Sequence, residues 1–134
     1  QFTQFGIPLG IAFQLRDDIL GVFGDPSVTG KPAGDDLREG KRTVLVALTL
    51  EALTERSPSM AESFEELLTS RELDTHQIAF MQKLIKDSGA LEKTERMIVE
   101  LGDRSLESLD TANLEESAKA TLKALALKVI SRDA

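Results

Sequence analysis

The stretch FQLRDDILGVFGD, residues 13–25, places two adjacent aspartates in an otherwise apolar helical pattern. At about 100° per residue of an α-helix, one arc of roughly 100° collects the polar and small residues: Gln14, Asp17, Asp18, Gly21 and Asp25. The rest of the circumference is apolar, with Arg16 as its single charge. The stretch therefore predicts a helix that packs through its apolar side and carries a polar stripe.

The remainder of the sequence is also helical in pattern. Leu, Ala, Glu and Lys are plentiful, Tyr and Trp are absent, and β-branched residues never alternate with polar ones for long, which favours helices over strands. We expect helices over residues 8–23, 43–54, 59–70, 74–87, 89–109 and 114–131. The predicted fold class is all-α, a helical bundle, and the segment 43–54, which is apolar nearly all round, is expected to be buried.

A long loop is predicted between the first two helices. Residues 24–42 contain four glycines and two prolines, a density of helix breakers that regular structure does not accept. A loop of this length in a compact domain is often functional.

Composition excludes several classes of function. A chain of 134 residues is about one domain, and its net charge of -7 disfavours nucleic acid and anionic membranes as partners. Cysteine is absent and His76 is the one histidine, so that no cysteine or histidine cluster can bind a metal; His76 is expected at a helix start, in a surface or capping role.

The location and completeness of the chain can also be predicted. The apolar first 23 residues contain Arg16, Asp17 and Asp18 in their middle, where charges are costly in lipid, so no stable membrane insertion is expected. We expect a cytoplasmic protein. Because the sequence begins with Gln, we also expect it to be a piece of a longer chain.

The paired carboxylates are the strongest indication of chemistry. Two like charges on a mostly apolar helix repel each other, and a cation is expected to compensate them. Mg²⁺ takes oxygen ligands, often one or two carboxylates together with substrate phosphates. Lys31 and Lys41, among the glycines of the loop, offer charges for phosphate oxygens. The spacing alone leaves two alternatives open: a solvated helix face at Asp17 and Asp18, and a salt-bridged surface loop.

Four short motifs together resemble the second aspartate-rich region of trans-polyprenyl diphosphate synthases. They are FQLRDD at 13–18, GK at 30–31, DL at 36–37 and GKRT at 40–43, in that order and spacing. The sequence GALE at 89–92, followed by a long helix, resembles the C-terminal segment of the same family. The likeness covers essentially the whole chain, and geranylgeranyl diphosphate synthases of actinobacterial type are the most similar in pattern.

This resemblance implies a fold and a reaction. Residues 1–134 would form the C-terminal part of an isoprenoid synthase fold, in a parent prenyltransferase that condenses isopentenyl diphosphate with an allylic diphosphate into a longer polyprenyl diphosphate. The first aspartate-rich motif and the residues that bind isopentenyl diphosphate are not in this sequence, so the chain alone is expected to be inactive, and the product length cannot be predicted. The alternative is a non-catalytic helical regulatory subunit or interaction module derived from the same fold.

The resemblance also assigns roles to individual residues. Asp17 and Asp18 would bind Mg²⁺ on the allylic diphosphate, Gln14 would line the same site, and Lys31 and Lys41 would hold diphosphate oxygens. The catalytic set is thus the two aspartates and the two lysines.

One position departs from the family pattern. The usual third aspartate of the motif falls at residue 21, where this chain has Gly21. Asp25, one turn further along the same face, is the candidate to assist in its place.

The resemblance further implies a homodimeric parent, and we expect this chain to self-associate. Helices that the rest of the parent would cover are expected to expose apolar side chains. The candidates are Ile11, Leu15, Ile19, Phe23, Val44, Leu45 and Leu48.

Overall fold

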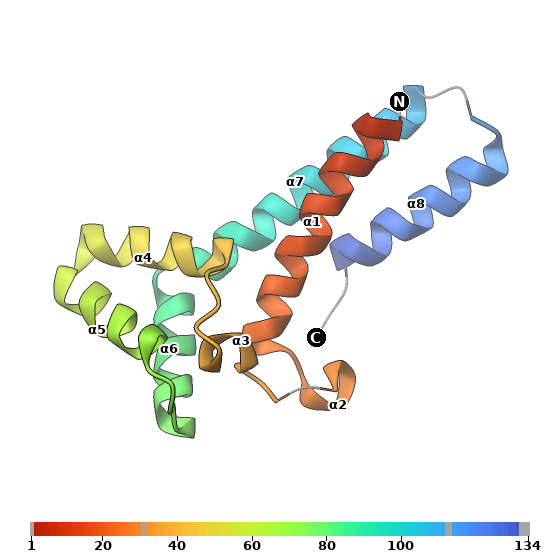
Figure 1. The fold of residues 1–134 in the computed structure, drawn as a ribbon. Helices are drawn as coiled ribbons and strands as arrows, with labels where there is room; N and C mark the ends of the chain where they lie inside the picture. The colour runs from red at the N-terminus through yellow and green to blue at the C-terminus, as the bar shows by residue number, and fades with distance from the viewer. Residues whose placement is uncertain (1, 31, 112–113, 132–134) are drawn as a thin grey trace. The chain divides into compact units, whose positions relative to one another are not determined.

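The computed structural model describes residues 2–30, 32–111 and 114–131, and helices are the only regular elements in these ranges (Figure 1). In chain order they are α1 (Phe2–Phe23), α2 (Pro26–Thr29), α3 (Asp35–Arg38), α4 (Val44–Arg56), α5 (Pro58–Thr69), α6 (Thr75–Asp87), α7 (Ala90–Thr111) and α8 (Glu116–Ser131). The predicted all-α fold class is confirmed. None of the described helices is both long enough and apolar enough to cross a membrane.

The helices α4 to α8 begin and end within two residues of the predicted bounds, and local capping explains why. The hydroxyl of Thr43 accepts a 3.1 Å hydrogen bond from the amide of Val46 at the start of α4. Asp74 and Gln77 form a reciprocal capping box at the start of α6. Such caps satisfy amides that have no partner within the helix.

The predicted start of the first helix was wrong, because α1 begins at Phe2 and contains Pro8 in its interior. Proline opens helices readily, and the prediction therefore placed it in the first turn. The additional turns before Pro8 are stabilised by tertiary contacts instead. Phe5 is 5% exposed, and its carbonyl accepts a 2.8 Å hydrogen bond from the hydroxyl of Ser105.

The prediction that the segment 24–42 is a loop was partly wrong, because the segment contains the two short helices α2 and α3. Asp25 caps α2, its carboxylate accepting a hydrogen bond of 2.9 Å from the amide of Ser27. In α3, Leu37 is completely buried. A cap and a buried side chain thus stabilise single helical turns that helix propensity alone would not.

The chain divides into two compact units. The first contains the described residues up to Arg16 together with those from Glu95 onward, and the second is Asp17–Thr94.

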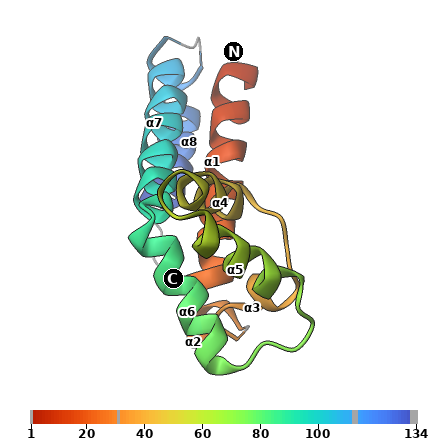
Figure 2. The ribbon, with the colours of Figure 1, turned by 90° about the vertical axis from the view of Figure 1, so that its left-hand side faces the viewer.

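In the first unit, α7 lies beside the N-terminal part of α1 (Figure 2), to which Ser105 is hydrogen-bonded. A Cβ atom at Gly102 of α7 would lie 2.3 Å from the side chain of Ile130, so the glycine allows α8 to approach closely. Arg16 of α1 donates a 2.9 Å hydrogen bond to the carbonyl of Ile130 and lies 3.7 Å from the carboxylate of Glu95. A cation at the C-terminal end of α8 is favourable, because that end carries unpaired carbonyls and a partial negative charge.

In the second unit, α4, α5 and α6 pack against one another. Its core contains the completely buried side chains of Leu45, Phe64, Met81 and Ile85. The amide of Gln82 on α6 donates a 2.7 Å hydrogen bond to the carbonyl of Val22. The ammonium of Lys86 lies 5.1 Å from the ring centre of Phe23. α6 thereby holds the C-terminal turn of α1.

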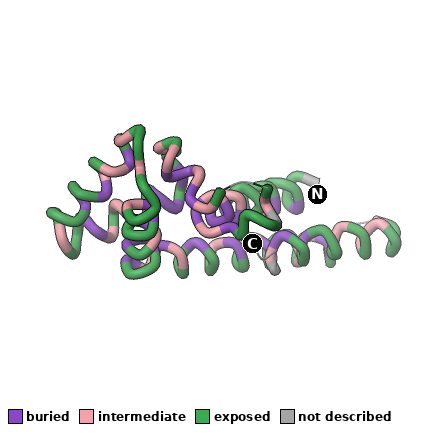
Figure 3. Tube along the Cα trace, turned by 90° about the horizontal axis from the view of Figure 1, so that it is seen from below, coloured by how far each residue is buried: buried purple, intermediate pink, exposed green. Residues whose placement is uncertain are grey.

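Burial along the helices tests the predicted apolar faces (Figure 3). The predicted stripe on α6, from Ile78 to Ile85, is buried. The expected burial of 43–54 holds for one side of the helix: Leu45 is fully buried while Val44 is 43% exposed, because only one side of α4 meets α5 and α6. Among the predicted exposed residues, Ile11 and Val44 are exposed, whereas Leu15, Ile19 and Leu45 are buried.

The turn before α3 gives a test of the fold. Gly34 and Gly30 have φ angles of 78° and 74°, a conformation that costs an alanine about 1 to 2 kcal/mol. A Cβ at Gly34 would also lie 2.5 Å from the stiff, buried side chain of Ile78, whereas a Cβ at Gly30 meets nothing within 4 Å. We expect Gly34→Ala to lower the free energy of unfolding by a further ~1 to 3 kcal/mol over Gly30→Ala.

The measurement is denaturant unfolding of the complete protein and of both variants. Equal losses in the two variants would show that the contact between residue 34 and Ile78 does not constrain this turn.

Candidate active site

The candidate site begins with the aspartate pair, which α1 carries at the start of the second unit. Asp18 is 3% exposed and Asp17 is half-buried, and Ile19 and Leu20 beside them are buried. The solvated helix face that the sequence left open therefore does not describe Asp18. A buried carboxylate is tolerated only where polar or cationic groups compensate it.

The carboxylate of Asp36, from α3, lies directly against α1 at Gly21. A Cβ atom at residue 21 would be 2.0 Å from one carboxylate oxygen of Asp36 and 2.3 Å from its carboxyl carbon. Asp36 is 8% exposed. Because Gly21 follows Asp17 by one helical turn, the third carboxylate of this region reaches the same helix face from another element.

Asp36 also contacts Lys41 twice. The ammonium of Lys41 lies 3.8 Å from a carboxylate oxygen of Asp36, and the backbone amide of Lys41 donates a 2.9 Å hydrogen bond to the carbonyl of Asp36. The side chain of Lys41 is 50% exposed and that of Asp36 12% exposed. The second unit thus contains the predicted site residues Asp17, Asp18 and Lys41, and Asp36 links Lys41 to α1 at Gly21.

The position of α3 is fixed by contacts on its other side. Leu37 is completely buried, and the guanidinium of Arg38 donates a 2.8 Å hydrogen bond to the carbonyl of Ala33. Gly34, which precedes α3, packs against Ile78 of α6. The Asp36 carboxylate is therefore held by a packed turn.

Arg42, next to Lys41, is committed to a carboxylate of the protein. Its guanidinium donates two hydrogen bonds to Glu65 on α5, one of them 2.8 Å long. The hydrogen bond from Arg42 lowers the pKa of Glu65 below its ordinary value of 4.5, and the same bond raises the pKa of Arg42. This pair anchors the end of the loop to α5 and distinguishes Arg42 from Lys41, whose ammonium pairs with Asp36.

The other predicted residues lie apart from this arrangement. Gln14 is exposed on α1 and belongs to the first unit, so its part in the site stays a prediction. Lys31 lies outside the described residues. The carboxylate of Asp25 accepts hydrogen bonds from the amide and hydroxyl of Ser27, and these bonds, the amide first, lower its pKa. His76 is exposed in the first turn of α6, as expected.

The carboxylates fit a magnesium site in which the protein supplies only some of the ligands. Among the described residues, no group of three or more histidine, cysteine or acidic side chains is arranged to hold a metal ion by itself. Mg²⁺ commonly needs only one or two carboxylates when substrate phosphates and water complete its coordination. Asp17 and Asp18 meet this smaller requirement.

Sequence analysis missed the role of two residues. Asp36 was part of a motif but had no assigned contact, and the signal was Gly21 itself, because an isolated glycine inside a helix often marks a close approach. Arg16 was only a charge in an apolar pattern, yet it holds the end of α8.

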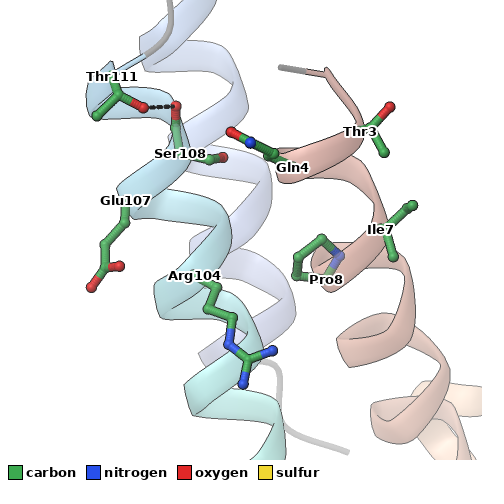
Figure 4. A pocket seen from close by; sticks show the side chains of 8 residues that line it. All are labelled: Thr3, Gln4, Ile7, Pro8, Arg104, Glu107, Ser108 and Thr111. Carbon is green, nitrogen blue, oxygen red and sulfur yellow. Dashed lines mark hydrogen bonds between the residues drawn. The ribbon is translucent and has the colours of Figure 1, made fainter.

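A groove of about 540 Å³ opens on the first unit, between α1 and α7 (Figure 4). Ile7 and Pro8 line it on one side and Arg104 and Glu107 on the other. It contains none of the predicted site residues, so it is not the candidate active site.

Comparison with known proteins places this arrangement in a family. The sequence profile of the polyprenyl synthetase family matches residues 1–85, which include the aspartate pair, α3 and Lys41. The chain belongs to the polyprenyl synthetase family. The resemblance inferred from the four motifs is confirmed.

Named relatives of this polyprenyl synthetase chain support the family assignment. Geranylfarnesyl diphosphate synthase of Aeropyrum pernix is 67% identical over 43 residues, covering 32% of this chain and 14% of the relative. Geranylgeranyl diphosphate synthase of Saccharolobus solfataricus is 53% identical over 55 residues, covering 41% and 17%. In both comparisons, the matched region is therefore less than a fifth of the relative's own length.

A solved structure extends the likeness to the whole fold. Geranylgeranyl pyrophosphate synthase from Corynebacterium glutamicum, crystallised with isoprenyl diphosphate and magnesium, has a TM-score of 0.91 and 44% identity. The match covers 96% of this chain and 36% of that one. The expected isoprenoid synthase type of helical fold is confirmed.

The ion pair between Arg42 and Glu65 predicts a dependence of stability on pH. Because the pKa of Glu65 is lowered in the folded state, the pair stabilises the fold above the ordinary pKa and loses this effect as pH falls through the folded pKa. We expect Glu65→Gln to unfold at a lower temperature than the wild type at pH 7, with a difference that disappears as the pH falls well below 4.5.

Glu66→Gln is the matched control, since Glu66 is the neighbouring exposed glutamate of α5. Thermal unfolding of the complete protein across this pH range decides the matter. A difference for Glu65→Gln that persists unchanged at the lowest pH would contradict an electrostatic origin.

Proposed function

We propose that the complete protein containing this chain is a magnesium-dependent prenyltransferase that condenses isopentenyl diphosphate with an allylic diphosphate into a longer polyprenyl diphosphate. The observation that carries the proposal is the grouping of Asp17, Asp18, Asp36 and Lys41 in one packed unit. Relatives named geranylgeranyl and geranylfarnesyl diphosphate synthase support it.

The aspartates are proposed as the metal ligands of this chain. Asp17 and Asp18 would hold Mg²⁺ through one or both carboxylates, and diphosphate oxygens would complete the coordination. The bound metal supplies charge stabilisation for the departing diphosphate. Burial strengthens this contribution, because electrostatic interactions are weakly screened around Asp18, which is 3% exposed.

Lys41 is proposed to bind the same diphosphate. Its ammonium is half exposed at the edge of the unit, where a phosphate oxygen can reach it, whereas the guanidinium of Arg42 is occupied by Glu65. As the bond between the allylic carbon and oxygen breaks, its electron pair stays with the diphosphate. A positioned ammonium then lowers the energy of the growing negative charge. Gln14 and Lys31 are proposed, by the family resemblance, to line this site and to bind diphosphate.

Three further statements belong to this proposal. The protein acts in the cytoplasm, it takes both diphosphates as partners, and it forms a homo-oligomer, which the exposed Ile7, Ile11 and Leu127 support. A non-catalytic regulatory subunit would have no need for the aspartate pair and Lys41, all of which this chain keeps.

Two aspartates of the same stretch, the half-buried Asp17 and the exposed Asp25, provide a direct test of the metal assignment. In the complete protein, Asp17→Ala is expected to reduce kcat by about 10²-fold, the loss typical of one preorganised electrostatic group. Asp25→Ala is expected to change kcat much less, because the Asp25 carboxylate is turned to Ser27 at the start of α2.

Radiolabelled isopentenyl diphosphate with an allylic co-substrate and MgCl₂ gives the rates. Asp25→Ala serves as the control for a lost carboxylate in the same motif. Equal rates for the wild type and Asp17→Ala would remove Asp17 from the site.

A further inference from the structure

We propose that Asp36 is a positioning residue that acts through Lys41, and that Gly21 is the residue that admits it to the site. This inference rests on the proposed function and adds to it that the carboxylate of Asp36 takes the place of the side chain missing at residue 21. It accounts for the departure of this chain from the family motif at residue 21 by a contact observed in the fold.

The first step concerns the space at Gly21. Glycine inside a helix is unfavourable relative to alanine, so its presence in α1 calls for a reason. The reason lies in α3: any Cβ at residue 21 would be 2.0 Å from a carboxylate oxygen of Asp36. Gly10, in the same helix, has nothing within 4 Å of such a Cβ. The close approach is therefore specific to residue 21.

The second step concerns the link from Asp36 to Lys41. The two residues are joined by a hydrogen bond from amide to carbonyl of 2.9 Å and by the ion pair of 3.8 Å between their side chains. Gly40, between them in sequence, has a φ of 67° and packs against the carbonyl of Leu68. Lys41 is thus joined to Asp36 through both its backbone and its side chain.

The third step is the consequence for a diphosphate. A lysine ammonium has three donors, and an ion pair with Asp36 occupies one side of it. The side chain is half exposed, so a diphosphate oxygen can reach the ammonium. Holding a long side chain in place before the ligand arrives reduces the entropy lost on binding. Asp36 should therefore act on diphosphate affinity and, through the ammonium that stabilises the departing diphosphate, on kcat as well.

The test is a double-mutant cycle on the complete protein, with inorganic pyrophosphate and MgCl₂ as the probe in titration calorimetry. Asp36→Asn keeps the size of the side chain and removes its charge, and is expected to weaken pyrophosphate binding by about fivefold, the range of a partly exposed ion pair. In a Lys41→Met background, Asp36→Asn is expected to have no further effect. KM for the allylic diphosphate and kcat should follow the same pattern, each changing in Asp36→Asn and neither changing further in the Lys41→Met background.

A second arm tests the role of Gly21. Gly21→Ala should displace the Asp36 carboxylate and weaken pyrophosphate binding as much as Asp36→Asn does. The same substitution in an Asp36→Ala background should add nothing, because the clashing carboxylate is gone. Gly10→Ala is the matched control on the same helix and should bind as the wild type does. Thermal unfolding midpoints show whether each variant is folded, and the Asp36→Ala background keeps the test valid if Gly21→Ala alone unfolds.

The outcomes separate this inference from the proposed function. Additive effects of Asp36→Asn and Lys41→Met would mean that Asp36 acts independently of Lys41 and would overturn the positioning role. Unchanged binding by Gly21→Ala would overturn the role of the glycine. A wild-type protein that neither binds pyrophosphate nor forms a prenyl product would instead overturn the proposed function, and the inference with it.

Discussion

The close approach of α3 to α1 at Gly21 is the constraint on which the candidate site depends. A buried carboxylate occupies the space that any side chain at residue 21 would need, and Lys41 is in turn paired with that carboxylate. The absence of a side chain at residue 21 therefore allows α3 to lie close to α1, with the carboxylate of Asp36 in the space between them. The place of a basic group depends on it as well, because the ammonium of Lys41 pairs with the Asp36 carboxylate.

The helix α6 supports both sides of this approach. Ile78 packs against the glycine that precedes α3, while Gln82 donates a hydrogen bond to the carbonyl of Val22 at the C-terminal turn of α1. Lys86 lies over the ring of Phe23 nearby, where a cation is favoured both by the aromatic ring and by the end of the helix. A helix without any predicted site residue thus fixes the two elements that carry them.

Sequence reasoning succeeded where the signal is local and failed where the stabilising contact is distant. The caps at Thr43 and Asp74 are encoded within three residues of each helix start, and those boundaries were predicted. The turns of α1 before Pro8 are supported by Ser105, and α3 is supported by burial of Leu37. Neither contact produces a periodic pattern in the sequence. The start of α1 was therefore misplaced, and α3 was missed.

The sequence by itself determined the all-α fold class, the family and the helical register of Asp17 and Asp18, because periodicity, capping residues and motif spacing are properties of neighbouring residues. It also showed that residue 21 is a glycine where the family pattern has an aspartate. Only the tertiary structure decided what lies in that space. The path from Gly21 to Asp36 passes through turns with positive φ at Gly30 and Gly34, and packing of Leu37 fixes where they end. Contacts of this kind follow from the balance of burial and sterics over the whole unit, which no local pattern records.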